Sequence, residues 1–207
     1  MLNREGKRGG EQQKKSRTPP SLPRLRGEVG KGDGGLGVEM GDMNTPFFPY
    51  AENADYLAAL VTTQEERAAV FAVRMVVFVE EQAVPPEEEL DALDVTATHF
   101  LARLKKPSPD EPLGIVGAAR LVDKGGGTGK IGRVAVLQEH RGRGVGALLM
   151  RVAEAAARAQ SMTRVVLDAQ CQAIPFYERL GYTVEGDIFL DAGIEHRLMW
   201  KDLAGDS

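Results

Sequence analysis

The stretch VAVLQEHRGRGVGALLM, residues 134–150, sets an apolar run typical of a strand against three alternating glycines and then an apolar run typical of a helix. After the glycines, apolar residues recur at i, i+3, i+4, i+7 and i+11, the stripe of a helix that lies on a sheet: Val145, Leu148, Leu149, Val152 and Ala156. The stretch therefore predicts a strand, a glycine turn and a helix over residues 145–158.

The glycine turn has the composition of a phosphate site. A helix that begins at such a turn presents several unpaired backbone N–H groups, and its dipole adds roughly half a positive charge at that end. Gly142, Gly144 and Gly146 let the backbone approach an anion closely, and Arg141 and Arg143 add full positive charges. We expect a bound phosphate group there; a tight turn without a ligand is the alternative interpretation.

A dinucleotide-binding fold is a second interpretation of the same turn. Gly142, Gly144 and Ala147 satisfy the pattern G-x-G-x-x-A, and Asp168 closes the next strand about where a ribose-binding acid belongs. Against it, the four polar residues QEHR separate the strand from the first glycine, and the strands before it look like hairpins. Only 39 residues follow Asp168, too few to complete a doubly wound domain.

Composition indicates one globular domain with an unevenly charged chain. Of 207 residues, 43% are apolar and 27% are charged. Residues 1–31 carry a formal charge of +6 and residues 32–207 a charge of −10. The acidic body argues against a nucleic-acid-binding surface and favours cationic partners such as amines. A single cysteine, Cys171, and the lack of an apolar run of membrane-spanning length indicate a reducing, aqueous compartment, the cytoplasm.

The first 43 residues differ from the rest in composition. They are basic and rich in glycine and proline, which predicts a disordered tail before a domain over residues 45–203. A mitochondrial presequence is the alternative, but prolines and glycines break the segment and it has no sustained apolar helical face.

The order of predicted elements indicates an α/β (α+β) domain. Thr63 and Glu66 form a capping box before a helix over residues 64–79, and residues 79–98 read as an exposed acidic connection. The residues predict strands at 56–61, 99–104, 113–122, 130–137, 164–168 and 194–200. They also predict a third, short helix at 172–182, closed by Gly181. We expect a mixed, mostly antiparallel sheet of six or seven strands with helices on both faces.

Two of these stretches together resemble the GNAT superfamily of N-acyltransferases. RGRGVG matches its R/Q-x-x-G-x-G/A pyrophosphate signature in Arg141, Gly144 and Gly146. QAIPFYERLGY resembles its Ala-x-x-x-Tyr helix ending in Gly-Phe, with Tyr182 in place of the phenylalanine. The segments VFVEEQAVPPEEELDALDVTATHF, GRVAV and GIEHRLM look like the ElaA/YjcF-like branch, so that the resemblance covers roughly residues 55–201.

The resemblance implies acetyl-CoA, or another acyl-CoA, as cosubstrate and no metal. The pyrophosphate would lie on residues 142–147 and the pantetheine arm between the strands GRVAV and RVVLD, where a backbone N–H would polarise the thioester carbonyl. Gln170 stands where many members carry an asparagine. The implied cofactor-binding residues are Val134, Ala135, Val136, Arg141, Gly142, Arg143, Gly144, Val145, Gly146, Ala147, Gln170 and Phe176.

Acyl transfer to an amine needs a proton acceptor and a proton donor. An amine with a pKa of about 10.4 is protonated at pH 7, and exposing its lone pair costs about 4–5 kcal/mol. Four side chains are candidates for accepting this proton, directly or through a water: Glu81, Asp94, His99 and His196. The family places a tyrosine at Tyr177, which would return a proton to the CoA thiolate. Cys171 has no histidine nearby in sequence, so we set a covalent mechanism aside.

The sequence therefore predicts an enzyme that moves an acetyl group from acetyl-CoA to a primary amine by direct attack in a ternary complex. A catalytically inactive acyl-CoA sensor is the alternative. The acceptor is a small-molecule or peptide amine, with neither nucleic acid nor membrane as a partner, and a homodimer is left open.

Overall fold

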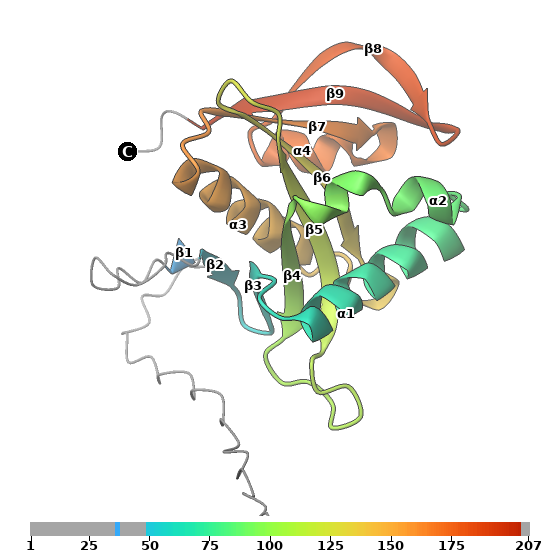
Figure 1. The fold of residues 1–207 in the computed structure, drawn as a ribbon, viewed down its shortest axis with the longest axis vertical. Helices are drawn as coiled ribbons and strands as arrows, with labels where there is room; N and C mark the ends of the chain where they lie inside the picture. The colour runs from blue at the N-terminus through green and yellow to red at the C-terminus, as the bar shows by residue number, and fades with distance from the viewer. Residues whose placement is uncertain (1–35, 38–48, 204–207) are drawn as a thin grey trace, which may run out of the picture. The chain divides into compact units, whose positions relative to one another are not determined.

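A mixed sheet of nine strands organises the part of the chain that the computed structural model describes, residues 36–37 and 49–203 (Figure 1). Its order is β1-β2-β3-β4-β5-β6-β7-β9-β8, and only β6 and β7 run parallel. The strands are β1 (Leu36–Gly37), β2 (Tyr50–Glu52), β3 (Tyr56–Leu60), β4 (Thr98–Leu104), β5 (Ile115–Asp123), β6 (Thr128–Val136), β7 (Arg164–Gln170), β8 (Thr183–Asp191) and β9 (Ile194–Asp202).

The predicted mixed, mostly antiparallel sheet is confirmed. The first two strands are two and three residues long, and the remaining seven correspond to the predicted six or seven. Apart from β1, the predicted disordered tail of residues 1–43 lies outside the described residues. The domain boundary at residue 45 lies there too and stays a prediction.

Helices cover both faces of the sheet, as predicted (Figure 1). Val70, Val73 and Val77 of the first helical segment pack on one face, and Leu148 and Leu149 of α3 pack on the other. Successive β4 residues alternate between these two clusters because side chains alternate along a strand. The helical segments are α1 (Gln64–Arg74), η1 (Met75–Glu80), α2 (Pro86–Glu89), η2 (Ala92–Val95), η3 (Gln138–His140), α3 (Val145–Ala159), η4 (Cys171–Ala173) and α4 (Ile174–Arg179).

Local sequence signals explain where these helices begin and end. The capping box of α1 is present: Glu66 N–H donates to Thr63 Oγ1 at 3.1 Å, and the Thr63 N–H donates to the Glu66 carboxylate at 3.3 Å. Such a cap stabilises a helix by about 1 kcal/mol. The helix continues past Arg74 as a π-helix to Glu80, and α4 ends before Gly181, whose φ is +86°.

The short strands β1 and β2 were not predicted, and neither was β8. It is an edge strand whose residues are almost all exposed, and its register with β9 shifts between Glu185 and Phe189. Because neither face of β8 is buried, its sequence does not show the alternation of apolar and polar residues that marks a half-buried strand. The three consecutive apolar residues Ile188, Phe189 and Leu190 are all exposed.

The acidic segment of residues 79–98 is not the exposed connection that its charge predicted. It contains α2 and η2, and Glu89 and Asp94 are only 2% and 5% exposed. Arg74 of α1 reaches both carboxylates, with Nη1 at 2.7 Å from Asp94 Oδ1. Arg120 of β5 lies 2.8 Å from the same oxygen, and Arg133 of β6 lies 2.8 Å from Glu89 Oε2.

We call these five side chains, Arg74, Glu89, Asp94, Arg120 and Arg133, the arginine–carboxylate cluster. Burial acts to raise the pKa of Asp94, but hydrogen bonds and charges from Arg74 and Arg120 outweigh it, so the pKa lies well below its usual range. Asp94 is therefore ionised at neutral pH. Counting charges along the chain failed here because it does not show that three other elements supply arginines to these carboxylates, two of them buried.

We predict that Asp94→Ala lowers the free energy of unfolding by about 3–5 kcal/mol, because it leaves two buried guanidinium groups without their shared carboxylate. Urea unfolding at pH 7 measures this. Because the pKa of Asp94 is lower in the folded state, its contribution is present above about pH 4 and disappears as the pH falls further. Asp110→Ala, at an exposed carboxylate of the β4–β5 loop, is the control; equal losses in the two variants would contradict the prediction.

Candidate active site

Strands β6 and β7 part soon after they begin. Their parallel pairing joins only Thr128, Gly129 and Lys130 to Arg164, Val165 and Val166. Beyond these pairs, β6 continues to Val136 and β7 to Gln170 without pairing to each other. The opening expected between residues 132–136 and 164–168 is present from Leu167 onward, whereas residues 164–166 are still paired to β6.

A bulge in β6 accompanies the parting. The register with β5 shifts where Ala118 pairs Ala135 and Arg120 pairs Gly132. Arg133 lies in the bulge with φ at +54°, a conformation that costs a non-glycine residue about 1–2 kcal/mol. Such bulges bend a strand, and side-chain contacts of Arg133 with the acidic segment hold this one in place.

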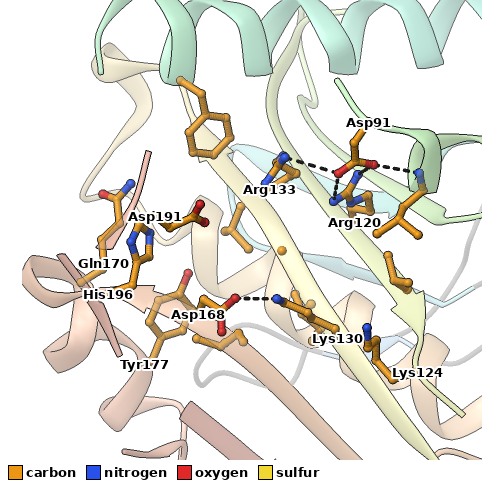
Figure 2. A pocket seen from close by; sticks show the side chains of 18 of the residues that line it. Asp91, Arg120, Lys124, Lys130, Arg133, Asp168, Gln170, Tyr177, Asp191 and His196 are labelled. Carbon is orange, nitrogen blue, oxygen red and sulfur yellow. Dashed lines mark hydrogen bonds and ion pairs between the residues drawn. The ribbon is translucent and has the colours of Figure 1, made fainter. Parts of the chain in front are cut away.

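A cavity of about 320 Å³ lies where the two strands part. Residues 131–134 of β6 form one wall, and Leu167, Asp168 and Gln170 of β7 form the other. A smaller recess of about 110 Å³ shares Phe78, Gln82, Arg133, Gln170, Asp191 and His196 with it. We call the two together the cleft (Figure 2).

Two predicted catalytic residues, Tyr177 and His196, line this cleft (Figure 2). Tyr177 lies on α4 and is 9% exposed, and burial raises the pKa of its phenol to about 12. His196 lies on β9, stacks on Phe189, and places Nδ1 2.8 Å from the carbonyl oxygen of Ile194. A carbonyl only accepts, so Nδ1 carries the proton, and Nε2, which has no hydrogen-bond partner among the described residues, is available to accept one.

The other three candidates for the proton acceptor do not line the cleft. Asp94 is held in the arginine–carboxylate cluster. His99 Nε2 donates to the Asp94 carbonyl oxygen at 2.9 Å, while its buried Nδ1 has no partner among the residues described. Burial lowers the pKa of His99, which favours the neutral ring. Glu81 forms an ion pair with Arg141 of the glycine turn.

The glycine turn is exposed and open. Gly142 and Gly144 have φ values of +73° and +81°, and a Cβ placed on Gly142 would meet nothing within 4 Å. Leu148 N–H bonds back to the Gly144 carbonyl at 3.1 Å, but the backbone N–H groups of residues 142–147 have no hydrogen-bond partner in the described part of the chain. These N–H groups at the start of α3 suit a phosphate anion.

Contacts with β3 and with the turn between β2 and β3 position the glycine turn, and sequence reasoning did not find them. Asn53 Nδ2 donates to the Arg143 carbonyl oxygen at 3.1 Å, and Tyr56 OH lies 2.9 Å from His140 Nδ1. Arg141 Nε donates to the Val136 carbonyl oxygen at 2.8 Å. No local motif around Asn53 marks this role, because its partner lies 90 residues further along the chain.

The predicted cofactor residues lie partly in the cleft and partly in the glycine turn outside it, and Ala135 lies in neither. Val134 and Gln170 line the cleft, whereas Ala135 packs on the opposite face under α1. None of residues 141–147 lines the cleft itself. Helix α4 connects the two regions, because a Cβ on Gly146 would lie 3.2 Å from the Phe176 ring, and that ring lies 4.9 Å from the ring of Tyr177. Of the remaining predicted cofactor residues, Val145 is buried, and Val136 and Ala147 are half-buried.

Several cleft residues were not anticipated. Gln82, after η1, accepts a hydrogen bond from Gln170 Nε2 at 2.7 Å, so it meets the end of β7. Phe78 of η1 and Asp191 of β8 also line both parts of the cleft. A π-helix often marks a functional site, but its presence was not readable from the sequence.

In residues 36–37 and 49–203, no helix has the length and apolarity needed to cross a bilayer. In the same part of the chain, no three His, Cys, Asp or Glu side chains are grouped as metal ligands.

Fold and cleft together define an acyltransferase-type architecture, and comparisons with known proteins agree. The model of the acetyltransferase (GNAT) family matches residues 52–182. The uncharacterised N-acetyltransferase YjcF of Bacillus subtilis is 40% identical over 146 residues, which cover 70% of this chain and 99% of YjcF. The chain belongs to the GNAT family of acetyltransferases.

Solved structures show the same fold. An acyl-CoA N-acyltransferase from Pseudomonas aeruginosa is 30% identical with a TM-score of 0.58, covering 71% of this chain and 98% of that one. ElaA of Escherichia coli is 25% identical with a TM-score of 0.58, covering 70% and 97%. The predicted resemblance to the GNAT superfamily and its ElaA/YjcF-like branch is confirmed, and the dinucleotide-binding interpretation is wrong.

We predict that the phenol of Tyr177 stays protonated until the pH approaches 12, because burial disfavours the phenolate. The difference in ultraviolet phenolate absorbance between the unmodified protein and Tyr177→Phe measures this group alone. Circular dichroism at each pH checks that the chain stays folded. A difference signal with a midpoint near 10, the value for an exposed phenol, would contradict the assigned burial.

Proposed function

We propose that this protein transfers an acetyl group from acetyl-CoA to a primary amine. The observation that carries the proposal is the juxtaposition of Tyr177 and His196 in the cleft where β6 and β7 part. Membership of the GNAT family supports an acyl-CoA as donor. We further propose that the acyl group is acetyl and that the acceptor is a primary amine.

The glycine turn is the proposed site of the CoA diphosphate. The free N–H groups of residues 142–147 and the positive end of α3 attract an anion. Arg143 is exposed and adds a full charge, while Arg141 shares its charge with Glu81. From there the pantetheine arm runs past α4 into the opening, where unpaired β6 backbone groups beside Val134 are available to its amides.

His196 is the proposed acceptor of the amine's proton. Its Nδ1 is committed to the Ile194 carbonyl, which fixes the ring and leaves Nε2 as the basic nitrogen. Glu81 and Asp94 are tied into ion pairs, and His99 does not line the cleft. The geometry therefore favours His196 among the four candidates.

Tyr177 is the proposed proton donor to sulfur. A phenol whose pKa is raised to about 12 keeps its proton at neutral pH, so it can act only as a proton donor in direct contact with the acceptor atom. The thiol of CoA has a reference pKa near 8.5, so its thiolate is a weaker base than the phenolate of Tyr177. The phenol therefore donates its proton while it receives another one, and no free phenolate forms.

The reaction balances through these two side chains. The acceptor ammonium loses one proton to His196, and its nitrogen lone pair forms the C–N bond to the thioester carbonyl carbon. The C–S bond then breaks with its electron pair on sulfur, and sulfur takes a proton from Tyr177. At the same time the nitrogen passes its second proton to the phenol oxygen of Tyr177, which restores the phenol. The proton on His196 then passes to solvent.

We predict that Gly142→Ala weakens CoA binding about tenfold or more, because a methyl group at this open left-handed position occupies the space that the diphosphate needs. Isothermal titration with CoA measures it. Gly186→Ala is a matched control: its φ is also +73°, a Cβ there also meets nothing within 4 Å, and it lies in β8 away from the turn. Both changes strain the backbone similarly, so equal CoA affinities would contradict the proposed site.

We predict that His196→Gln and Tyr177→Phe each lower kcat/KM for acetyl transfer at pH 7 by about 100-fold. Thiol release from acetyl-CoA with a panel of amines measures this. Activity of His196→Gln should rise with pH toward the pKa of the acceptor, about 10.4, because the free amine no longer needs a base. His99→Gln is the comparison and should keep the normal pH profile. CoA binding without thiol release for any amine would instead support an inactive sensor.

A further inference from the structure

Most charged side chains that line the larger cavity neutralise one another. Arg120 Nη1 lies 2.7 Å from Asp91 Oδ1, and Lys130 forms an ion pair with Asp168 (Figure 2). Arg133 faces Glu89, as described above. These pairs form part of the walls and leave no net charge for a ligand.

Two charged groups of the cavity lining are left over. Neither Lys124 Nζ nor the carboxylate of Asp191 has an ion pair or hydrogen bond with any residue in the described part of the chain. Both line the larger cavity, and Asp191 also lines the recess that contains His196. Both residues are exposed to solvent, so each attracts an opposite charge on a ligand with the modest strength of an exposed ion pair.

The sheet places these two groups at opposite ends of the cleft. Lys124 follows β5, and its N–H bonds to Thr128, which pairs with the first residue of β7. Asp191 pairs with Ile194 at the start of β9, beside the pairing of His196 with the last residue of β7. Figure 2 shows the same arrangement, with the Lys130–Asp168 pair between the two ends.

We propose that the acceptor is an amine that carries an anionic group, a carboxylate or phosphate, at the end remote from the reacting nitrogen. This inference rests on the proposed function. The ammonium is attracted toward Asp191, where His196 Nε2 takes its proton, and the anionic group lies toward Lys124. A lysine ammonium is a point charge without bidentate geometry, so both anion types fit it.

The orientation follows from charge alone. A reversed acceptor would place its anion against Asp191 and its ammonium against Lys124, two repulsive contacts. An acceptor with a second ammonium in place of the anion would meet repulsion at Lys124. The two unpaired groups therefore select both the class of acceptor and its direction in the cleft.

Three series of acceptors test the proposal: ω-amino acids, n-alkylamines of equal chain length, and α,ω-diamines. Aminoalkyl phosphates form a fourth arm that distinguishes phosphate from carboxylate. We expect kcat/KM by thiol release to favour the anionic amines over alkylamines by about fivefold, the upper value for one solvent-exposed ion pair. Equal use of alkylamines, or a preference for diamines, would overturn the inference while leaving acetyl transfer intact.

The variant Lys124→Glu gives a sharper result. Its preference for ω-amino acids over alkylamines should fall by at least about fivefold, and diamines should become the better acceptors. Lys106→Glu makes the same charge change at an exposed lysine outside the cleft lining and should leave the preference unchanged. Identical ratios in the two variants would show that Lys124 does not meet the acceptor.

Binding decides the case in which no amine releases thiol. Thermal stability of the CoA-loaded full-length protein is then measured with 6-aminohexanoate and with hexylamine. Greater stabilisation by 6-aminohexanoate, lost in Lys124→Glu, would support the recognition of an anionic amine although the proposed acetyl transfer had failed. Equal shifts, or none, would overturn the inference.

Discussion

The short pairing between β6 and β7 is the constraint on which the site depends. Three residue pairs hold the two strands together, and the cleft exists because the strands part after Lys130. The bulge at Arg133 bends β6 at this point, and the guanidinium of Arg133, whose φ is +54°, is held by the acidic segment. Backbone geometry and a side-chain network thus act on the same residue.

The arginine–carboxylate cluster links the opening to the rest of the fold. It joins α1, β5 and β6 to the acidic segment. Arginines from these three elements therefore hold the acidic segment, including Asp91, which lines the cleft. Buried ion pairs contribute little net stability compared with apolar packing, but removing one partner is costly because the other charge is left buried. The cluster is therefore better suited to fixing position than to supplying overall stability.

The chemistry of the cleft follows from how its polar atoms are occupied. Ile194 holds one nitrogen of His196 and so determines which nitrogen is basic, and burial keeps the Tyr177 phenol protonated. Pairing among the cavity's other charges leaves Lys124 and Asp191 to distinguish ligands. Reactivity and selectivity therefore rest on the few groups that the protein leaves without partners of its own.

The sequence by itself determined the elements whose signals are local. The capping box at Thr63, the apolar stripe of α3, the glycine turn and the end of α4 before Gly181 are each specified by residues within one or two helical turns, because backbone preference and periodicity act over that range. The role expected for Tyr177 came instead from the resemblance to the GNAT superfamily. The mixed sheet followed from the order of these elements.

Only the tertiary structure decided which residues meet in the cleft. His196 and Asp94 were both candidates for the proton acceptor, and the tertiary structure placed His196 beside the last residue of β7 and Asp94 in contact with two arginines. The burial of Glu89 was likewise invisible, because its partners Arg74 and Arg133 lie on other elements, far from it in the chain. Strand β8 was missed for a different reason: it pairs with the adjacent β9, but its exposed residues show no alternation of buried and exposed positions. Contacts between distant segments produce no periodic pattern in the sequence, so they could not be predicted from it.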